Sequence, residues 1–181
     1  MSDLGVQRGK VIVVPFDSSW KKEFEKEKEK LLDTFGNKII NIEHIGSTAI
    51  PGLCAKPIID INVAIHSLEQ AQSFIEPLEQ LGYEYIAERH FKDRYFFPKG
   101  TKSNRTHHLN LVEIGSQTGW INPLLFRDYL IHNSEMRDYY CNLKRNLSYR
   151  YSDNREKYTE RKSDFVRTIL EKANNQYSDS K

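Results

Sequence analysis

The pattern of hydrophobic and polar residues predicts a β-sheet in the larger, N-terminal part of the chain. Six segments are rich in β-branched or aromatic residues and are bounded by turn-forming or polar residues, as strands are: 11–14, 38–45, 57–65, 83–88, 93–98 and 107–114. The last two segments are expected to pair as a hairpin. We therefore expect a mixed sheet of about five to seven strands.

The segment Pro57–Ile65 is expected to lie near the centre of this sheet. It is apolar on most of both faces, which is typical of a strand that is covered on two sides. Asp60 and Asn62 are its polar residues. Because side chains alternate between the two faces of a strand, Asp60 and Asn62 point to the same side.

Hydrophobic positions at helical spacing predict helices between and after these strands. The residues Asp17–Ser19 can cap a helix that ends at Phe35, before Gly36. A second helix is expected over Leu68–Leu81, with a kink at Pro77. Three more are expected near the C-terminus, over 123–132, 135–149 and 154–174.

Together these elements predict an α+β fold in a single domain over residues 1–181. A mixed sheet core is expected over residues 11–120 and a helical C-terminal segment over residues 121–175, packed on the sheet or beside it. A chain of 181 residues can bury a core without disulfides or metal ions.

Composition and charge exclude several classes of protein. The chain has 27 basic and 25 acidic residues, a net charge of +2, which gives no strong signal for nucleic acid or for an anionic membrane. Its two cysteines, Cys54 and Cys141, indicate neither a disulfide framework nor a zinc site. No apolar run is long enough to span a membrane and no signal peptide is evident, so a cytoplasmic protein is expected.

The segment from Ile42 to Ile65 carries the clearest chemical signal. A predicted strand ends at Gly46-Ser47, and the next predicted strand carries Asp60. A Gly-Ser turn offers backbone N–H groups and a hydroxyl to a phosphate, and oxygen ligands on the neighbouring strand suit Mg²⁺. This combination favours a nucleotide, or another phosphate-bearing small molecule, as the ligand.

Several longer motifs resemble the GrpB family (UPF0157). They are HIGSTAIPG at His44–Gly52, AKPIID at Ala55–Asp60, HHLNLV at His107–Val112 and FRDYL at Phe126–Leu130. A domain of this family is also found fused to the C-terminus of some bacterial dephospho-CoA kinases. The resemblance covers nearly the whole chain and implies a nucleotidyltransferase-like fold.

The residue pattern and the resemblance together predict roles for particular residues. Asp60 and Ser47 are the expected catalytic residues. The expected ligand contacts are Gly46, Ser47, Thr48, Lys56, Arg94, Arg105 and His108. Magnesium is expected on Asp60, Asn62 and Asn110.

Two positions depart from the pattern. Asn62 stands where the wider nucleotidyltransferase fold has an acidic residue, and Asn110 stands where GrpB-like sequences commonly have His. Because carboxylates supply the charge that holds a hard cation, magnesium affinity is expected to be weak with Asp60 alone. The departures weigh against catalysis more than against nucleotide binding.

Three functions are open at this point. The first is nucleotidyl transfer, in which an acceptor attacks the α-phosphorus of a nucleoside triphosphate. The second is a non-catalytic module that assists folding or senses a nucleotide. The third is a metal-dependent hydrolase built on a cluster of His44, Asp60, His108 and Asn110, with zinc, iron or manganese. The sequence determines neither the acceptor nor the oligomeric state.

Two other features have plainer interpretations. The segment Phe126–Leu130 is expected to pack the helical segment on the sheet, with Arg127 and Asp128 in structural ion pairs. The segment Lys144–Lys172 holds nine basic and five acidic residues, which indicates a mildly basic helical face in contact with solvent.

Overall fold

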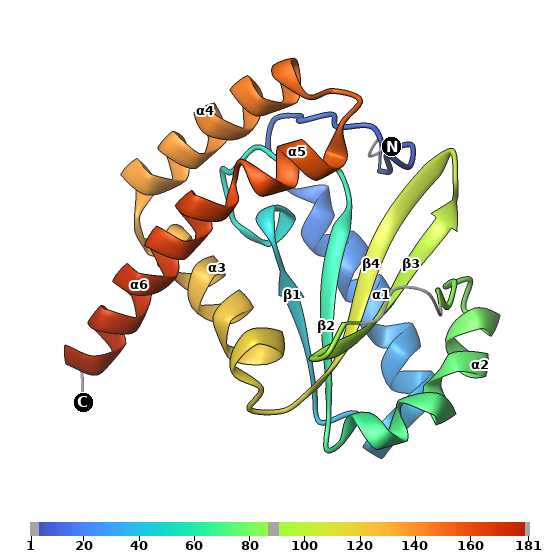
Figure 1. Cartoon of the computed structure of the whole chain (residues 1–181). Coiled ribbons are helices and arrows are strands. Elements are labelled where there is room, and N and C mark those ends of the chain that lie inside the picture. Colours follow the sequence, from blue (N-terminus) through green and yellow to red (C-terminus); the bar gives the residue numbers. More distant parts are fainter. Residues whose placement is uncertain (1–3, 87–90, 180–181) are drawn as a thin grey trace.

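A computed structural model of the chain describes residues 4–86 and 91–179. Its centre is a mixed sheet of four strands: β1 (Asn41–Ile45), β2 (Ile59–Ile65), β3 (Arg94–Thr101) and β4 (Asn104–Glu113). They lie in the order β1-β2-β4-β3, with β2 parallel to β4 and the other neighbours antiparallel (Figure 1). The predicted α+β class, the interior position of β2 and the β3–β4 hairpin are confirmed.

The prediction of five to seven strands is wrong for the part of the chain that the structure describes. Segment 11–14 makes one isolated bridge, from Val14 to Ala55, and segment 83–88 makes one from Tyr83 to Lys99. Both segments lie against other parts of the fold without extending the ladder. The end of the second segment, from residue 87, lies outside the described residues.

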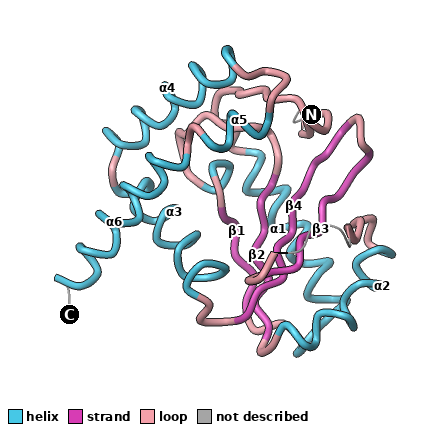
Figure 2. The backbone as a smooth tube through the Cα atoms, in the orientation of Figure 1, coloured by secondary structure: helices cyan, strands magenta, loops and turns pink. Residues whose placement is uncertain are grey.

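Helices cover both faces of the sheet (Figure 2). Helices α1 (Ser19–Phe35) and α2 (Gln72–Gln80) cover one face. A short π-helical turn (Gln117–Ile121) follows the last strand, and four α-helices come after it: α3 (Asn122–His132), α4 (Ser134–Arg150), α5 (Arg155–Glu160) and α6 (Ser163–Asp179). The predicted helix 68–81 begins as a 3-10 turn before α2, and the predicted helix 154–174 is divided into α5 and α6.

The main core lies between α1, α2 and one face of the sheet. Trp20, Phe24 and Leu31 of α1 are buried against Ile59 and Ile61 of β2. Burying side chains of this size stabilises a fold by about 1.5–3 kcal/mol each. This packing commits the residues with odd numbers in β2 to the core, so that Asp60 and Asn62 must face the other side of the sheet.

A disulfide joins the two cysteines, which the sequence analysis did not expect. Cys54 lies in the loop before β2 and Cys141 lies on α4, with their Cα atoms 5.4 Å apart. The residues are separated by 87 positions in the sequence, so only the folded chain brings them together. The bond ties the loop that follows Gly46-Ser47 to the C-terminal helices.

No helix in residues 4–86 or 91–179 is long and apolar enough to cross a membrane.

Candidate functional site

Strand register brings Asp60 and His108 together. β2 and β4 are parallel neighbours, and Asp60 lies opposite His108. Because directly opposed residues share a face of the sheet, the two side chains meet. His108 Nδ1 donates a hydrogen bond to Asp60 Oδ1 over 3.0 Å. The pair is the centre of the candidate site.

Gly46 lies directly against the Asp60 carboxylate. β1 pairs with β2 as far as Ile45, which lies opposite Asp60, and Gly46 then turns the chain with a φ of 70°. A Cβ at this position would lie 2.6 Å from Asp60 Oδ2, closer than atoms can approach. The position therefore requires glycine both for its backbone angle and for the space that Asp60 occupies.

Ser47 and Thr48 begin the short 3-10 turn Ser47–Ala49. Thr48 is buried, and its Oγ1 donates a hydrogen bond to the backbone oxygen of Ile58 over 3.1 Å. This bond joins the turn to the start of β2. It holds the Gly46-Ser47 turn at the end of the strand that carries Asp60.

A cavity of about 270 Å³ opens at this point, and we call it the Asp60 cavity. Its walls come from the Gly46-Ser47 turn, from the sheet and from the C-terminal helices. The lining residues are Gly46, Ser47, Thr48, Lys56, Ile58, Asp60, His108, Phe126, Tyr140, Lys144, Arg155, Tyr158, Thr159 and Lys162.

The C-terminal helices contribute most of the positive charge in the Asp60 cavity. Lys144 comes from α4, Arg155 from the start of α5 and Lys162 from the turn before α6. Lys144 is only 2% exposed, and its Nζ donates a hydrogen bond to the backbone oxygen of Cys54. The expectation that the basic residues of this segment only face solvent is therefore wrong for Lys144 and Lys162.

Two aromatic rings support the lysines. The Lys144 ammonium lies 4.5 Å from the centre of the Tyr140 ring. Lys56 and Lys162 lie 5.8 Å and 4.4 Å from the centre of the Tyr158 ring. Ring faces attract cations, so these contacts partly offset the mutual repulsion of the ammonium groups.

The basic side chains dominate the electrostatics of the Asp60 cavity; Lys144 is buried, and Lys56, Arg155 and Lys162 are half-buried. Burial, with repulsion from Arg155, lowers the pKa of Lys56 to about 8, although Asp60 acts in the opposite direction. Burial and repulsion from Lys56 lower the pKa of Lys162 to about 8. Burial, with repulsion from Lys162 and Lys56, lowers the pKa of Lys144 well below its ordinary value. A bound anion would relieve each of these effects.

Asp60 is held in its ionised form. Burial raises the pKa of its carboxyl, but the hydrogen bond from His108 and the nearby positive charges outweigh burial, so the pKa lies below its ordinary value. Among the residues that the structure describes, Asp60 is the only carboxylate in the lining, which it shares with Lys56, Lys144, Arg155 and Lys162.

The sequence-predicted residues Asn62 and Asn110 lie outside the Asp60 cavity. Asn110 Nδ2 donates to Asn62 Oδ1 over 3.1 Å, and Asn62 Nδ2 donates to the backbone oxygen of Gly119 over 2.7 Å. Asn62 is 1% exposed. These amides fasten the strands to the turn that precedes α3, which gives them a structural function.

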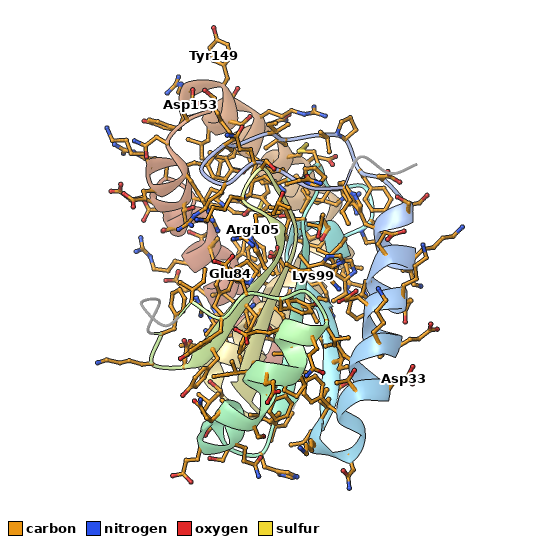
Figure 3. All side chains as sticks on the ribbon, turned by 90° about the vertical axis from the view of Figure 1, so that its right-hand side faces the viewer. Asp33, Glu84, Lys99, Arg105, Tyr149 and Asp153 are labelled. Carbon is orange, nitrogen blue, oxygen red and sulfur yellow. A yellow bond between two sulfur atoms is a disulfide. The ribbon has the colours of Figure 1, made fainter. Side chains whose placement is uncertain are left out.

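The two predicted arginines also lie outside the Asp60 cavity. Arg94 pairs with Asp93 over 3.3 Å and stacks on Phe91. Arg105 binds Glu84 and donates to the backbone oxygen of Gly100; Figure 3 shows the labelled pair on the β3–β4 side of the molecule. Arg105 lines a small adjacent hollow that shares Lys56, His108 and Arg155 with the Asp60 cavity.

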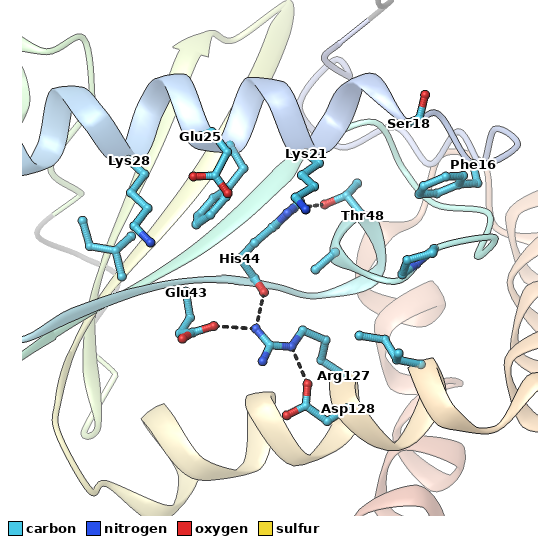
Figure 4. Close-up of a pocket in the computed structure, with 15 residues that line it drawn as sticks. Phe16, Ser18, Lys21, Glu25, Lys28, Glu43, His44, Thr48, Arg127 and Asp128 are labelled. Atoms are coloured by element: carbon cyan, nitrogen blue, oxygen red, sulfur yellow. Dashed lines mark hydrogen bonds and ion pairs between the residues drawn. The ribbon is translucent and has the colours of Figure 1, made fainter.

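A larger cavity, of about 450 Å³, lies between α1 and α3 over β1 (Figure 4). His44 forms part of its wall, stacks on Phe24 with 4.7 Å between ring centres, and donates from Nε2 to Thr48 Oγ1 over 3.0 Å. Burial is the main cause that lowers the pKa of His44 to about 4, so the ring is neutral at pH 7.

The arginine of the FRDYL motif fastens α3 to β1 beside this larger cavity. Arg127 donates to Glu43 over 2.6 Å and to Asp128 over 2.7 Å, and it also reaches the backbone oxygen of His44. These contacts agree with the expected structural ion pairs.

The donor groups of the Asp60 cavity do not suit magnesium. Asp60 is already bonded to His108, and both amides that were expected as ligands are bonded elsewhere. In the described part of the chain, no three His, Cys, Asp or Glu side chains gather in a way that could hold a metal ion. His44 lies on the α1 side of β1, away from the face that carries His108, so the expected histidine cluster does not form.

Two solved structures have folds similar to that of this chain. The crystal structure of conserved protein GrpB from Enterococcus faecalis matches with a TM-score of 0.85 and 32% identity, over 92% of this chain and 99% of that one. The structure of Cid1 in complex with the UTP analog UMPNPP matches with a TM-score of 0.53 and 16% identity, over 76% of this chain and 43% of Cid1. The second match shows a nucleotidyltransferase-like fold.

Sequence comparison points the same way. The glutamate-rich protein GrpB of Alkalihalophilus pseudofirmus is 39% identical over 172 residues, which is 92% of this chain and 98% of the relative. A dephospho-CoA kinase of Mycolicibacterium paratuberculosis is 34% identical over 86 residues, but this match spans only 46% of this chain and 21% of the kinase. The sequence model described as GrpB protein matches residues 10–172, and the chain therefore belongs to the GrpB family.

Proposed function

We propose that this protein binds a nucleotide, or another small molecule with phosphate groups, in the Asp60 cavity. One observation carries the proposal: among the described residues, four basic side chains and the Gly46-Ser47 turn line one cavity together with the carboxylate of Asp60. Buried cations are costly unless an anion compensates them. A phosphate-bearing ligand supplies that compensation and also accepts hydrogen bonds from Ser47.

The proposed binding requires no turnover. It is compatible with a module that senses a nucleotide or assists another protein, and it needs none of the missing metal ligands. Lys56 and Lys162 would pair with phosphate oxygens, because ammonium groups form strong charge-assisted hydrogen bonds with them.

Calorimetric titration tests the proposal. ATP and ADP are expected to bind, whereas adenosine, which lacks phosphate, is expected to bind much more weakly. Lys162→Gln should weaken ATP binding by roughly ten- to hundredfold, since hydrogen bonds to charged groups contribute about 1.5–3 kcal/mol. Lys157→Gln is the matched control, because Lys157 is exposed on the same helical segment and does not line the cavity.

Two results would contradict this proposal. Equal affinity for ATP and adenosine would show that the phosphates are not the recognised part. An equal loss in the Lys157→Gln and Lys162→Gln variants would show that general surface charge, and not the cavity, attracts the ligand.

Nucleotidyl transfer is a second candidate, and the Asp60–His108 hydrogen bond favours it. A carboxylate that holds one nitrogen of an imidazole leaves the other nitrogen to act as a general base. His108 would take the proton of an acceptor hydroxyl as its oxygen attacks the α-phosphorus of a nucleoside triphosphate. The bond from the α-phosphorus to the bridging oxygen would break, and pyrophosphate would leave.

Release of pyrophosphate tests this candidate. Purified protein would be incubated with ATP and a panel of hydroxyl acceptors, and pyrophosphate and the adenylylated product would be measured together. Loss of both in His108→Asn, with ATP binding retained, would support transfer. Absence of product from the wild-type protein with every acceptor, while ATP still binds, would favour the binding module.

A further inference from the structure

The charge of a phosphate chain must be compensated inside any cavity that holds it. Enzymes of phosphoryl and nucleotidyl transfer commonly use metal ions on carboxylates for this purpose. Here the described residues supply the Asp60 cavity with one carboxylate, whose Oδ1 is bonded to His108, and the amides of Asn62 and Asn110 are bonded outside it. The cavity instead gathers cationic side chains.

We propose that Lys56, Lys144, Arg155 and Lys162 compensate the ligand's charge in place of a metal ion, so that the Asp60 cavity binds a diphosphate or triphosphate group without magnesium. We call these four residues the cationic cage. This inference rests on the proposed function, which it makes more specific.

The origin of the four residues supports a binding role for the cationic cage. They come from four separate segments: the loop before β2, α4, the start of α5 and the turn before α6. A basic stripe along one helix is commonly a solvated face. Solvation does not explain why basic side chains from four separate segments line one cavity. Each additional cation there raises the electrostatic repulsion and so lowers the stability of the fold.

The environment of the lysines supports the same conclusion. Within the described residues, the Lys56 and Lys162 ammonium groups form no salt bridge, and both lie near the ring of Tyr158. Lys144 uses its ammonium to bind a backbone oxygen. A ring and a carbonyl stabilise a cation only partly, so that an incoming phosphate group can still gain strong ion pairs.

The amount of charge indicates the class of phosphate. A phosphate monoester carries about −1.5 to −2 charges at neutral pH. Among the described residues, three lysines and an arginine line the cavity, and these basic side chains outnumber the charges that one such group carries. A group with two or more phosphates is the better match.

Asp60 distinguishes the cationic cage from a metal site. In a metal site, Asp60 is the principal ligand and its loss abolishes binding. In the cationic cage, Asp60 is the counter-charge of Lys56 and the hydrogen-bond acceptor of His108, and it repels an incoming phosphate. Asp60→Asn is therefore expected to retain pyrophosphate binding or to tighten it.

The test is calorimetric titration of sodium pyrophosphate, first in excess EDTA and then in excess magnesium chloride. Binding is expected in EDTA, and it should weaken in magnesium, because the metal ion occupies the oxygens that the lysines need. A requirement for magnesium, together with loss of binding in Asp60→Asn, would overturn the inference and leave the proposed function in place. No binding of pyrophosphate, ADP or ATP under either condition would reject the proposed function itself.

Variants locate the binding. Lys56→Gln and Lys162→Gln should each weaken pyrophosphate binding in EDTA by roughly tenfold or more. Lys157→Gln is the control of equal charge change and should have little effect. Thermal unfolding of each variant shows whether it is folded. Unchanged affinity in both folded cavity variants would overturn the cationic cage.

Discussion

At the scale of single residues, two positions show what the fold requires. Gly46 leaves the space that the Asp60 carboxylate fills, and it has a positive φ. Glu27 lies in the middle of a charged stretch of α1 whose pattern indicates a solvated surface, yet it is 2% exposed. Its carboxylate binds Lys99 over 2.6 Å and Lys30 over 3.3 Å. At Gly46, the nearby Asp60 and the backbone angle require glycine. At Glu27, a partner that is distant in the sequence, Lys99, explains why a carboxylate is buried.

Gly46→Ala is expected to destabilise the protein by about 1–3 kcal/mol, because the added Cβ collides with Asp60 and the backbone angle becomes strained. Urea unfolding measures the change. Gly115→Ala is the control, since Gly115 also has a positive φ but has no atom within 4 Å of an added Cβ. If both variants lose the same stability, the contact with Asp60 contributes nothing.

Glu27→Gln is expected to destabilise the protein by about 3 kcal/mol, because it leaves the partly buried Lys99 without its carboxylate partner. Chemical denaturation measures the loss. Glu29→Gln, on the exposed side of the same helix, should change stability by less than about 0.5 kcal/mol. If Glu27→Gln also lowers the free energy of unfolding by less than about 0.5 kcal/mol, the structural role of Glu27 is contradicted.

The same ion pair predicts a pH dependence. Burial raises the pKa of Glu27, but Lys99 outweighs burial, so the pKa in the folded protein lies below the unfolded value of 4.5. The contribution of Glu27 to the stability of the folded protein is therefore fully present above pH 4.5. It is lost as the pH falls through the lower pKa of the folded state. The melting temperatures of the wild type and of Glu27→Gln should approach each other as the pH is lowered. A difference in melting temperature that stays the same at every pH would contradict this prediction.

At the scale of elements, the disulfide links two parts of the chain that together build the Asp60 cavity. Cys54 lies between the Gly46-Ser47 turn and β2, whereas Cys141 lies on α4, one turn before Lys144. Lys144 binds the backbone oxygen of Cys54. The disulfide therefore holds the loop and α4 in the positions in which Lys144 faces the Asp60 cavity.

Reduction of the disulfide is expected to lower the free energy of unfolding by about 2–5 kcal/mol, because the cross-link closes a long loop in the unfolded chain. Urea unfolding with and without a reducing agent measures the change. The double variant Cys54→Ala, Cys141→Ala should have the stability of the reduced wild-type protein, both with and without the reducing agent. A wild-type protein that is insensitive to complete reduction would contradict the prediction.

At the scale of the whole molecule, the Asp60 cavity exists only where the sheet meets the C-terminal helices. Gly46, Asp60 and His108 come from the sheet side, and Lys144 and Lys162 come from the helical side. A ligand held between them binds the folded state alone. Ligand binding should therefore stabilise the association of the two parts.

ATP is accordingly expected to raise the melting temperature of the protein. A ligand present at a hundred times its Kd stabilises the folded state by about 2.7 kcal/mol. Thermal shift measurements with ATP, and with adenosine as the control, should show the rise for ATP alone. The rise should shrink in Lys162→Gln and at high salt, because screening weakens charge pairs. A salt-independent rise would indicate that the lysines do not hold the ligand.

The sequence by itself determined the local features of the fold. Alternation placed Asp60 and Asn62 on one face of a strand with an apolar opposite face, and the structure places that strand inside the sheet. The motifs at His44–Gly52 and His107–Val112 identified the family. These features could be predicted because each depends on the period of a single element or on a continuous run of residues.

Only the tertiary structure decided which of the expected residues share the candidate site and which unexpected residues join them. Strand register placed His108 against Asp60, while the turn before α3 took up the amides of Asn62 and Asn110. Helix packing brought Lys144 and Lys162 to the Asp60 cavity, and the disulfide joined two distant cysteines. A helical period shows which residues share a face, but it does not show which surface that face will meet. That choice depends on the packing of the whole chain.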